Sequence, residues 1–151
     1  MSDLNLKKLK FSCQRCSLCC RINPGFVYLS LCDLTNLCNY FKLDSIAFIE
    51  KYCRWVSSND GDYYLCLLEK ENNDCIFWAE GGCKVYQVRP VQCSTFPFWT
   101  YYLESAQRWN ECSKLCPGIN KGNLHYAEEI AAELKKYEDN HPLKRSEYIK
   151  M

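Results

Sequence analysis

Four cysteines within eight positions near the start of the chain constrain its fold more than any other feature. They form the pattern Cys13-x2-Cys16-x2-Cys19-Cys20. A gap of two residues lets two thiolates turn toward one metal ion across a tight loop, as in zinc sites. Three cysteines at this spacing are also typical of ferredoxin-type iron–sulfur clusters. The motif therefore predicts a cysteine-ligated metal and leaves zinc and iron–sulfur as alternatives.

The adjacent pair Cys19-Cys20 adds a second constraint. Side chains of neighbouring residues diverge along helices and strands, so two adjacent thiolates seldom face one ion. Either one of the two is a spare thiol, or the pair serves two centres. Two centres need ligands from elsewhere, and the candidates are Cys75, Cys83, Cys93 and Cys116. Eight thiolates fit two zinc ions, one cluster with one zinc ion, or one cluster with unused thiols.

The redox state of these thiols depends on the compartment. The first ten residues lack the apolar segment of a secretory signal peptide, so we expect a cytoplasmic protein with reduced thiols. A disulfide framework is the alternative, although 13 cysteines cannot all pair within one chain. The net charge is +1, which argues against a nucleic-acid binder. No apolar run reaches the length of about 18–20 residues that spans a bilayer, so no membrane segment is expected.

Apolar periodicity and turn signals predict an α+β fold with several short helices and a short β-hairpin. One helix is expected over residues 31–41, with Ser30 as its N-cap. A second is expected to begin at residues 44–45 and to carry Cys53 on its apolar face. The clearest amphipathic pattern runs over residues 126–137 and predicts a third helix.

Strand signals lie between these helices. Residues 63–68 and 98–103 are rich in strand-forming side chains, and each predicts a strand. Residues 75–78 and 83–86 flank Ala79-Glu80-Gly81-Gly82, which predicts a tight hairpin with a cysteine at the start of each arm.

The chain shows no repeat and no linker that would divide it. We therefore predict a single small domain organised around cysteine-ligated metal. Residues 1–12 form a lead-in, residues 13–140 the metal-binding domain and residues 141–151 a C-terminal tail. A loop is expected between Pro117-Gly118 and Lys121-Gly122.

Five further cysteines fall outside the ligand set. Cys32, Cys38, Cys53 and Cys66 lie in predicted helices or strands, where a free cysteine behaves as a small apolar core residue. Cys112 lies four residues before Cys116 and is interpreted as either a substitute ligand or a resolving thiol.

Arginine and histidine side chains can assist thiolate ligands of a metal. A metal held by four thiolates carries about two net negative charges. Arg89, four residues before Cys93, is a candidate to offset that charge and to donate hydrogen bonds to sulfur. The alternative is a surface arginine before a turn proline. His125 and His141 have no partner at metal-ligand spacing, and we expect a helix cap and a tail residue.

The ordered motifs resemble those of the YkgJ family, the CxxCxxCC cysteine-cluster family described as a zinc- or iron-chelating domain. After the N-terminal motif come Cys75, Cys83, Arg89-Pro90, Cys93, Phe96-Pro97 and Cys116-Pro117-Gly118. The resemblance covers about residues 13–135, and it implies that the eight cysteines are metal ligands. It also implies that Arg89, Pro90 and Pro97 belong to the family's RP and FP signatures. Some larger proteins with a similar cysteine cluster are flagellin lysine methylases, but this chain is much shorter.

We therefore expect a cytoplasmic metal-binding protein that holds an iron–sulfur cluster, of the 4Fe-4S type, or Zn²⁺, or both. The first alternative is a metal-dependent protein-modifying or redox enzyme, or an accessory subunit of one. The second is a structural zinc module that binds a partner protein. No residue is assigned a catalytic role. The triplet of cysteines followed by a distant Cys-Pro favours the iron–sulfur cluster.

Overall fold

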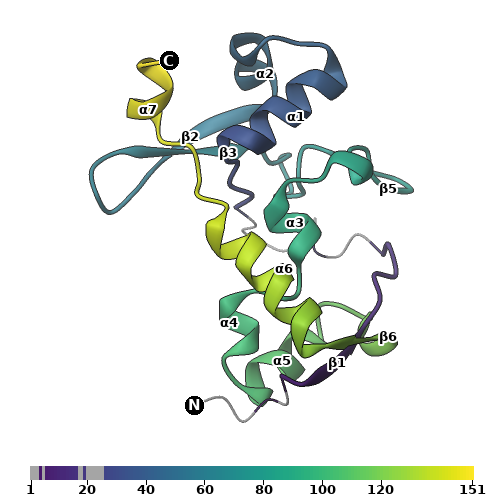
Figure 1. The fold of residues 1–151 in the computed structure, drawn as a ribbon. Coiled ribbons are helices and arrows are strands. Elements are labelled where there is room, and N and C mark those ends of the chain that lie inside the picture. Colours follow the sequence, from purple (N-terminus) through teal and green to yellow (C-terminus); the bar gives the residue numbers. More distant parts are fainter. Residues whose placement is uncertain (1–3, 5, 17–18, 20–25) are drawn as a thin grey trace. The chain divides into compact units, whose positions relative to one another are not determined.

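The computed structural model describes residues 4, 6–16, 19 and 26–151 (Figure 1). It combines short helices with two-stranded antiparallel sheets, so the predicted α+β class is confirmed. The chain divides into two compact units. Unit 1 comprises Met1–Cys19 and Thr95–Asp139, and unit 2 comprises Cys20–Ser94 and Asn140–Met151. Among the described residues, no helix has both the length and the apolar character needed to cross a membrane.

Unit 1 is a strand pair with three helices. In chain order its elements are β1 (Lys8–Phe11), α4 (Thr100–Leu103), α5 (Ala106–Cys112), β6 (Ile119–Tyr126) and α6 (Ala127–Asp139). β1 and β6 are antiparallel, and their register shifts between Lys10 and Phe11. The core is rich in aromatic residues and consists of Leu9, Phe96, Phe98, Leu103, Trp109, Cys112, Ile119 and Ile130.

Unit 2 contains the remaining elements. They are α1 (Leu31–Phe41), α2 (Ser45–Tyr52), β2 (Cys53–Ser57), β3 (Tyr63–Leu67), β4 (Trp78–Ala79), β5 (Gly82–Cys83), the 3-10 helix η2 (Tyr86–Val88), α3 (Val91–Thr95, of which Thr95 belongs to unit 1) and α7 (Arg145–Ile149). β2 pairs with β3, and β4 pairs with β5. The core consists of Leu29, Leu34, Leu37, Cys38, Phe48, Cys53, Leu65, Leu67, Phe77, Val85 and Leu143.

The first two helices begin where the sequence predicts. Ser30 caps α1 through a capping box: its hydroxyl accepts from the Asp33 N–H, and the Asp33 carboxylate accepts from the Ser30 N–H. Asp44 caps α2 by accepting the Ala47 N–H at 2.8 Å.

Cys53 is not part of this second helix, contrary to the prediction. Its backbone is extended and it opens β2 opposite Leu67, because pairing with β3 replaces the next helical turn.

Three other predictions about local structure are corrected. Residues 98–103 contain α4 rather than a strand, and their aromatic side chains pack on one another: Trp99 stacks on Tyr102 with ring centroids 5.8 Å apart. This packing overrides strand propensity, which depends strongly on context. The loop expected after Pro117-Gly118 continues into β6, because β1 pairs with it. His125 lies in β6 opposite Leu9 and is therefore not the cap of α6.

The predicted hairpin is present but shorter than expected. Only Trp78–Ala79 and Gly82–Cys83 pair as β4 and β5, with Trp78 opposite Cys83. Cys75 lies before the first arm and forms an isolated antiparallel β-bridge with Glu69. Residues 141–151 include α7, and Leu143 is buried in the core of unit 2.

Candidate metal centres

Unit 1 brings together thiols from both ends of its sequence. Cys13, Cys16 and Cys19 are exposed, and Cys116 is half-buried. Burial is the main cause that raises the pKa of Cys116, and the nearby thiols of Cys16 and Cys19 raise it further. The thiols of Cys16 and Cys19 therefore lie within electrostatic range of Cys116.

Two glycines make this convergence possible by allowing Ser12 to lie against the chain after Cys116. A Cβ atom at Gly118 would fall on the backbone carbonyl of Ser12, and one at Gly122 would fall on the Ser12 side chain. The Ser12 N–H donates to the Gly118 carbonyl at 3.2 Å, and the Ser12 hydroxyl accepts from the Asn123 N–H at 2.7 Å. Gly122 also has φ = +75°, which a side chain would disfavour. These contacts fix Cys13 in the neighbourhood of Cys116.

The backbone around the candidate ligands is arranged to stabilise thiolates. The Arg15 N–H donates to the Cys13 sulfur at 3.4 Å, and Arg15 has φ = +53°. The N–H groups of Gly118 and Ile119 donate to the Cys116 sulfur and lower its pKa against the effect of burial. Such N–H to sulfur bonds orient thiolates and tune clusters at metal sites. The donor set of unit 1 therefore fits zinc or an iron–sulfur cluster.

Unit 2 pairs two of its four candidate ligands. The half-buried thiols of Cys75 and Cys83 are close enough to interact. Burial raises the pKa of Cys75, the N–H groups of Phe77 and Trp78 lower it, and Cys83 raises it again. Cys93 is half-buried in α3, where its N–H donates to the Pro90 carbonyl at 2.9 Å. Cys20 lies outside the described residues.

Neither set of thiols is closed around one point. Within the part of the chain that the structure describes, no three His, Cys, Asp or Glu side chains are placed to share one metal ion. The structure nevertheless brings the sulfurs of Cys16 and Cys19 near that of Cys116, and the sulfur of Cys83 near that of Cys75. The completed coordination of eight ligands stays a prediction.

Arg89 is held by a neighbour on its own 3-10 turn. Its Nε donates to the Tyr86 carbonyl at 2.9 Å, and its guanidinium lies 3.9 Å from the centroid of the Tyr86 ring. A cation on an aromatic face is stabilised by the ring quadrupole. The role of Arg89 in offsetting thiolate charge stays a prediction.

The other cysteines divide by burial. Cys38, Cys53 and Cys66 are buried, as predicted for core residues. Cys32 is exposed on α1, so the expectation of a core position is wrong for it, because it lies outside the buried stripe of Leu34, Leu37 and Cys38. The cysteines within the described residues are free thiols and form no disulfide.

Cys112, left open between a ligand and a resolving thiol, is buried at the end of α5. Burial, and then the neighbouring Cys116, raises its pKa to about 12, against a hydrogen bond from Tyr102. Cys19 also lies within electrostatic range of Cys112. The Cys116 N–H donates to the Cys112 carbonyl at 2.9 Å, so one α-turn joins the two cysteines.

Burial predicts a large difference in thiol reactivity between Cys32 and Cys53. Burial raises the pKa of Cys53, so its thiolate fraction at pH 8 is far below that of an ordinary thiol, and only the thiolate reacts. We expect iodoacetamide at pH 8 to label exposed Cys32 at least about 100-fold faster than Cys53 in the folded protein. Mass spectrometry of peptides after timed quenching measures both rates. In urea-unfolded protein, which is the control, the two rates should be equal. Equal rates in the native protein as well would contradict the assignment of Cys53 to the core.

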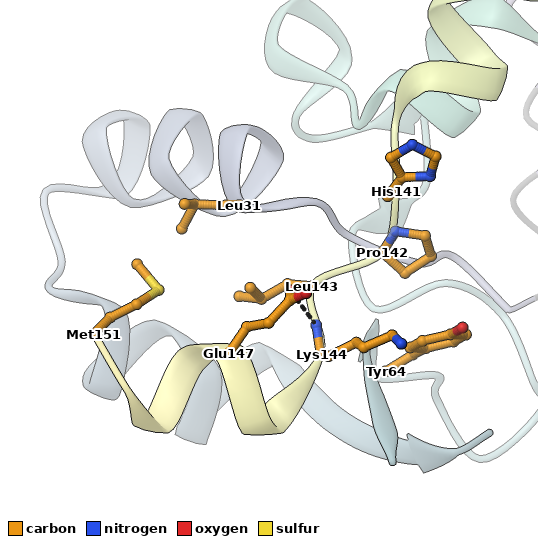
Figure 2. A pocket seen from close by; sticks show the side chains of 8 residues that line it. All are labelled: Leu31, Tyr64, His141, Pro142, Leu143, Lys144, Glu147 and Met151. Carbon is orange, nitrogen blue, oxygen red and sulfur yellow. Dashed lines mark hydrogen bonds between the residues drawn. The ribbon is translucent and has the colours of Figure 1, made fainter. Parts of the chain in front are cut away.

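The contacts of the two histidines are with groups other than the candidate thiolate ligands. His125 Nε2 donates to the Phe11 carbonyl at 2.8 Å, and its Nδ1 lies 3.3 Å from the Glu129 carboxylate. His125 therefore links β1, β6 and α6. His141 lines a cavity of about 550 Å³ in unit 2 (Figure 2). The cavity lies between α7 and the start of α1, and no cysteine lines it. It is therefore separate from the candidate metal ligands.

Sequence reasoning missed the residues that hold the ligands in place. Ser12 directly precedes the N-terminal motif and Gly118 falls in the Cys116-Pro117-Gly118 motif, but only the structure shows that they touch. Asp33 is 3 % exposed, and besides capping α1 it accepts the Val91 N–H at 3.0 Å and the Asn140 amide at 3.0 Å. The Ser30-x-x-Asp33 spacing identifies its role as a cap, but the contact with Val91 joins residues 58 positions apart.

A comparison with protein families finds one match. The model of CxxCxxCC, described as a "Putative zinc- or iron-chelating domain", matches residues 12–117. This range contains the N-terminal motif, Cys75, Cys83, Cys93 and Cys116. No solved structure matches the chain.

Proposed function

Because the chain belongs to the CxxCxxCC family of zinc- or iron-chelating domains, we propose that it is a metal-binding protein with two all-thiolate centres, one in each unit. The centre of unit 1 uses Cys13, Cys16, Cys19 and Cys116. The centre of unit 2 uses Cys20, Cys75, Cys83 and Cys93. The main support is the position of the unit boundary, which falls between Cys19 and Cys20. Adjacent thiolates that diverge toward two centres agree with the geometry of neighbouring side chains.

The hydrogen bonds to sulfur support the assignment in both units. In unit 1 they reach Cys13 and Cys116, and in unit 2 they reach Cys75. The donors are backbone N–H groups two or three residues after each cysteine. They stabilise a thiolate before any charge is offset by metal, and they fix the direction of the sulfur.

The pattern of ligands favours one type of metal over the other in unit 1. The cysteine triplet with Cys116-Pro117 favours an iron–sulfur cluster in unit 1. In unit 2, Cys83 lies in the hairpin and Cys75 lies just before it, and four thiolates are also a common ligand set of structural zinc sites. A bound cluster would supply electron transfer, and bound zinc would supply structure. Because both need reduced cysteines, we propose that the protein acts in the cytoplasm.

Elemental analysis with an anaerobic visible spectrum tests the proposal. We expect protein purified without oxygen to contain stoichiometric iron with sulfide, zinc, or both. A brown protein with broad absorption at roughly 400 nm, as expected for an iron–sulfur cluster, would support the cluster in unit 1. A colourless protein with two zinc ions per chain would replace it by zinc. Protein with less than about 0.1 metal per chain after anaerobic purification or reconstitution would refute the function.

Single Cys→Ser variants test the division into two centres. Cys16→Ser should lose the metal of unit 1 and keep that of unit 2, and Cys75→Ser should do the reverse. Cys38→Ser is the matched control, because Cys38 is buried in the core and is not a ligand. It should keep both metals with a lower thermal stability. If Cys16→Ser and Cys75→Ser deplete the same metal, a single shared centre replaces the two.

A further inference from the structure

The side-chain amide of Gln92 pairs with backbone in the way that a strand would. Its Nε2 donates to the Phe26 carbonyl at 2.7 Å, and its Oε1 accepts from the Tyr28 N–H at 3.0 Å. A carbonyl and an N–H that flank one residue are the two groups that a parallel strand offers to a neighbouring residue. The amide therefore takes the place of one residue of an added strand.

The opposite edge of this segment is already paired. The Val27 carbonyl accepts from the Leu67 N–H at 2.9 Å, and the Leu29 N–H donates to the Leu65 carbonyl at 3.0 Å. Alternate residues of a strand direct their polar groups to opposite sides. Phe26 and Tyr28 thus direct theirs away from β3, toward Gln92. Residues 26–29 are held between β3 on one side and a side chain of α3 on the other.

Gln92 stands beside a candidate ligand and reaches the chain that follows the cysteine motif. Cys93 is the next residue, and Phe26 is six residues after Cys20. α3 is held at its first residue as well, because the buried carboxylate of Asp33 accepts the Val91 N–H at 3.0 Å. Two consecutive residues before Cys93 are therefore tied to parts of unit 2 far away in the sequence.

We propose that Gln92 is a positioning residue for the metal centre of unit 2, where its amide sets the place of Cys93 relative to residues 26–29 beside β3. This rests on the proposed function, in which Cys93 binds the metal of unit 2. Outer contacts of this kind orient ligands, and their loss typically weakens metal affinity by about 10–100-fold. Sequence position alone gives Gln92 no such role, since the residue it serves lies across the fold.

Two substitutions separate the hydrogen bonds from the bulk of the side chain. Gln92→Glu keeps the shape and the acceptor for Tyr28 but places a carboxylate oxygen against the Phe26 carbonyl, where no proton joins them at neutral pH. Gln92→Met keeps the length and removes both hydrogen bonds. Gln87→Glu is the matched control, because Gln87 is exposed in η2 of the same unit and the charge change is identical.

Titration of the metal-free full chain with Co²⁺ under anaerobic conditions measures each centre, since the visible bands of cobalt report tetrahedral thiolate ligation. We expect wild type and Gln87→Glu to bind two Co²⁺ ions. Gln92→Glu and Gln92→Met should bind one ion normally and the other about 10–100-fold more weakly, with altered visible bands. Circular dichroism of the loaded proteins checks folding, and Gln92→Met serves if Gln92→Glu does not fold.

Three results would overturn the proposal. The first is equal affinity and identical bands for the Gln92 variants and Gln87→Glu. The second is equal weakening of both centres, which indicates general destabilisation. The third is a weakened site that persists in Gln92→Glu when Cys75→Ser has already removed the centre of unit 2, since the effect would then lie in unit 1. Wild type that binds no Co²⁺ and carries no metal when purified would instead refute the proposed function itself.

Discussion

Removal of the metals with a strong chelator is expected to lower the thermal midpoint of the full chain by more than about 10 °C and to reduce its helical circular-dichroism signal. Metal binding adds directly to folding free energy when the unfolded chain has no formed site. Cys13 and Cys116 are distant in the sequence, and in unit 1 their segments are joined by the pairing of β1 with β6 and by the contacts of Ser12, to which a shared metal would add a further cross-link. Loss of about 5 kcal/mol would shift the midpoint of a chain of this size by about 10–20 °C.

Chelation should not abolish all structure, because each unit has its own buried apolar cluster. Re-addition of the native metal should restore the midpoint, and that recovery is the control against irreversible damage. Scanning calorimetry and circular dichroism at matched protein concentration measure both effects. An unchanged midpoint in protein shown by elemental analysis to be metal-free would contradict the claim that thiolate ligation stabilises each unit.

Elements with strong local signals could be predicted from the sequence. α1 starts after Ser30, whose capping box is formed by residues three apart, and α2 starts after Asp44, whose carboxylate accepts the N–H of the residue three positions on. α6 follows from its apolar spacing, which places Ile130 in the core. In each case the determining contacts are made within about one turn of the chain, so a pattern in the sequence is enough.

Elements that depend on distant partners could not be predicted. His125 resembles a helix cap in the sequence, but β1, more than 100 residues earlier, pairs with it and makes it part of β6. Cys53 continues the apolar stripe of α2, but its partner Leu67 lies on another strand. Local propensity does not encode these pairings, which the fold as a whole determines.

The candidate site divides in the same way. The identity of the thiols follows from their spacing, since a two-residue gap directs sulfurs to one side of a tight loop. Their supports do not. Gly118 and Gly122 read as ordinary loop residues, yet each leaves room for Ser12. Gln92 is unremarkable between Pro90 and Cys93, and its function depends on backbone 64–66 residues away.

Trp109→Ala is expected to be the most destabilising single substitution in unit 1, by about 3–5 kcal/mol, since it removes a large buried aromatic side chain and leaves a cavity. Trp109 is 1 % exposed, and its ring stacks on Phe98 with centroids 5.9 Å apart. Its Nε1 donates to Asn120 at 2.9 Å, so it also joins α5 to the start of β6. The loss should show as a lower urea midpoint of the metal-loaded protein, followed by circular dichroism.

Trp109→Phe separates the two contributions of the tryptophan. Phenylalanine fills most of the volume and can stack on Phe98, but it cannot donate to Asn120, so we expect a smaller loss of about 1–2 kcal/mol. Trp109 lies on α5, whose last residue is Cys112, and the α-turn from Cys112 leads to Cys116. Trp109→Ala should therefore also weaken metal binding in unit 1 and leave unit 2 unaffected. A loss below about 1 kcal/mol for Trp109→Ala, or equal losses of metal from both units, would mean that this core does not support the centre of unit 1.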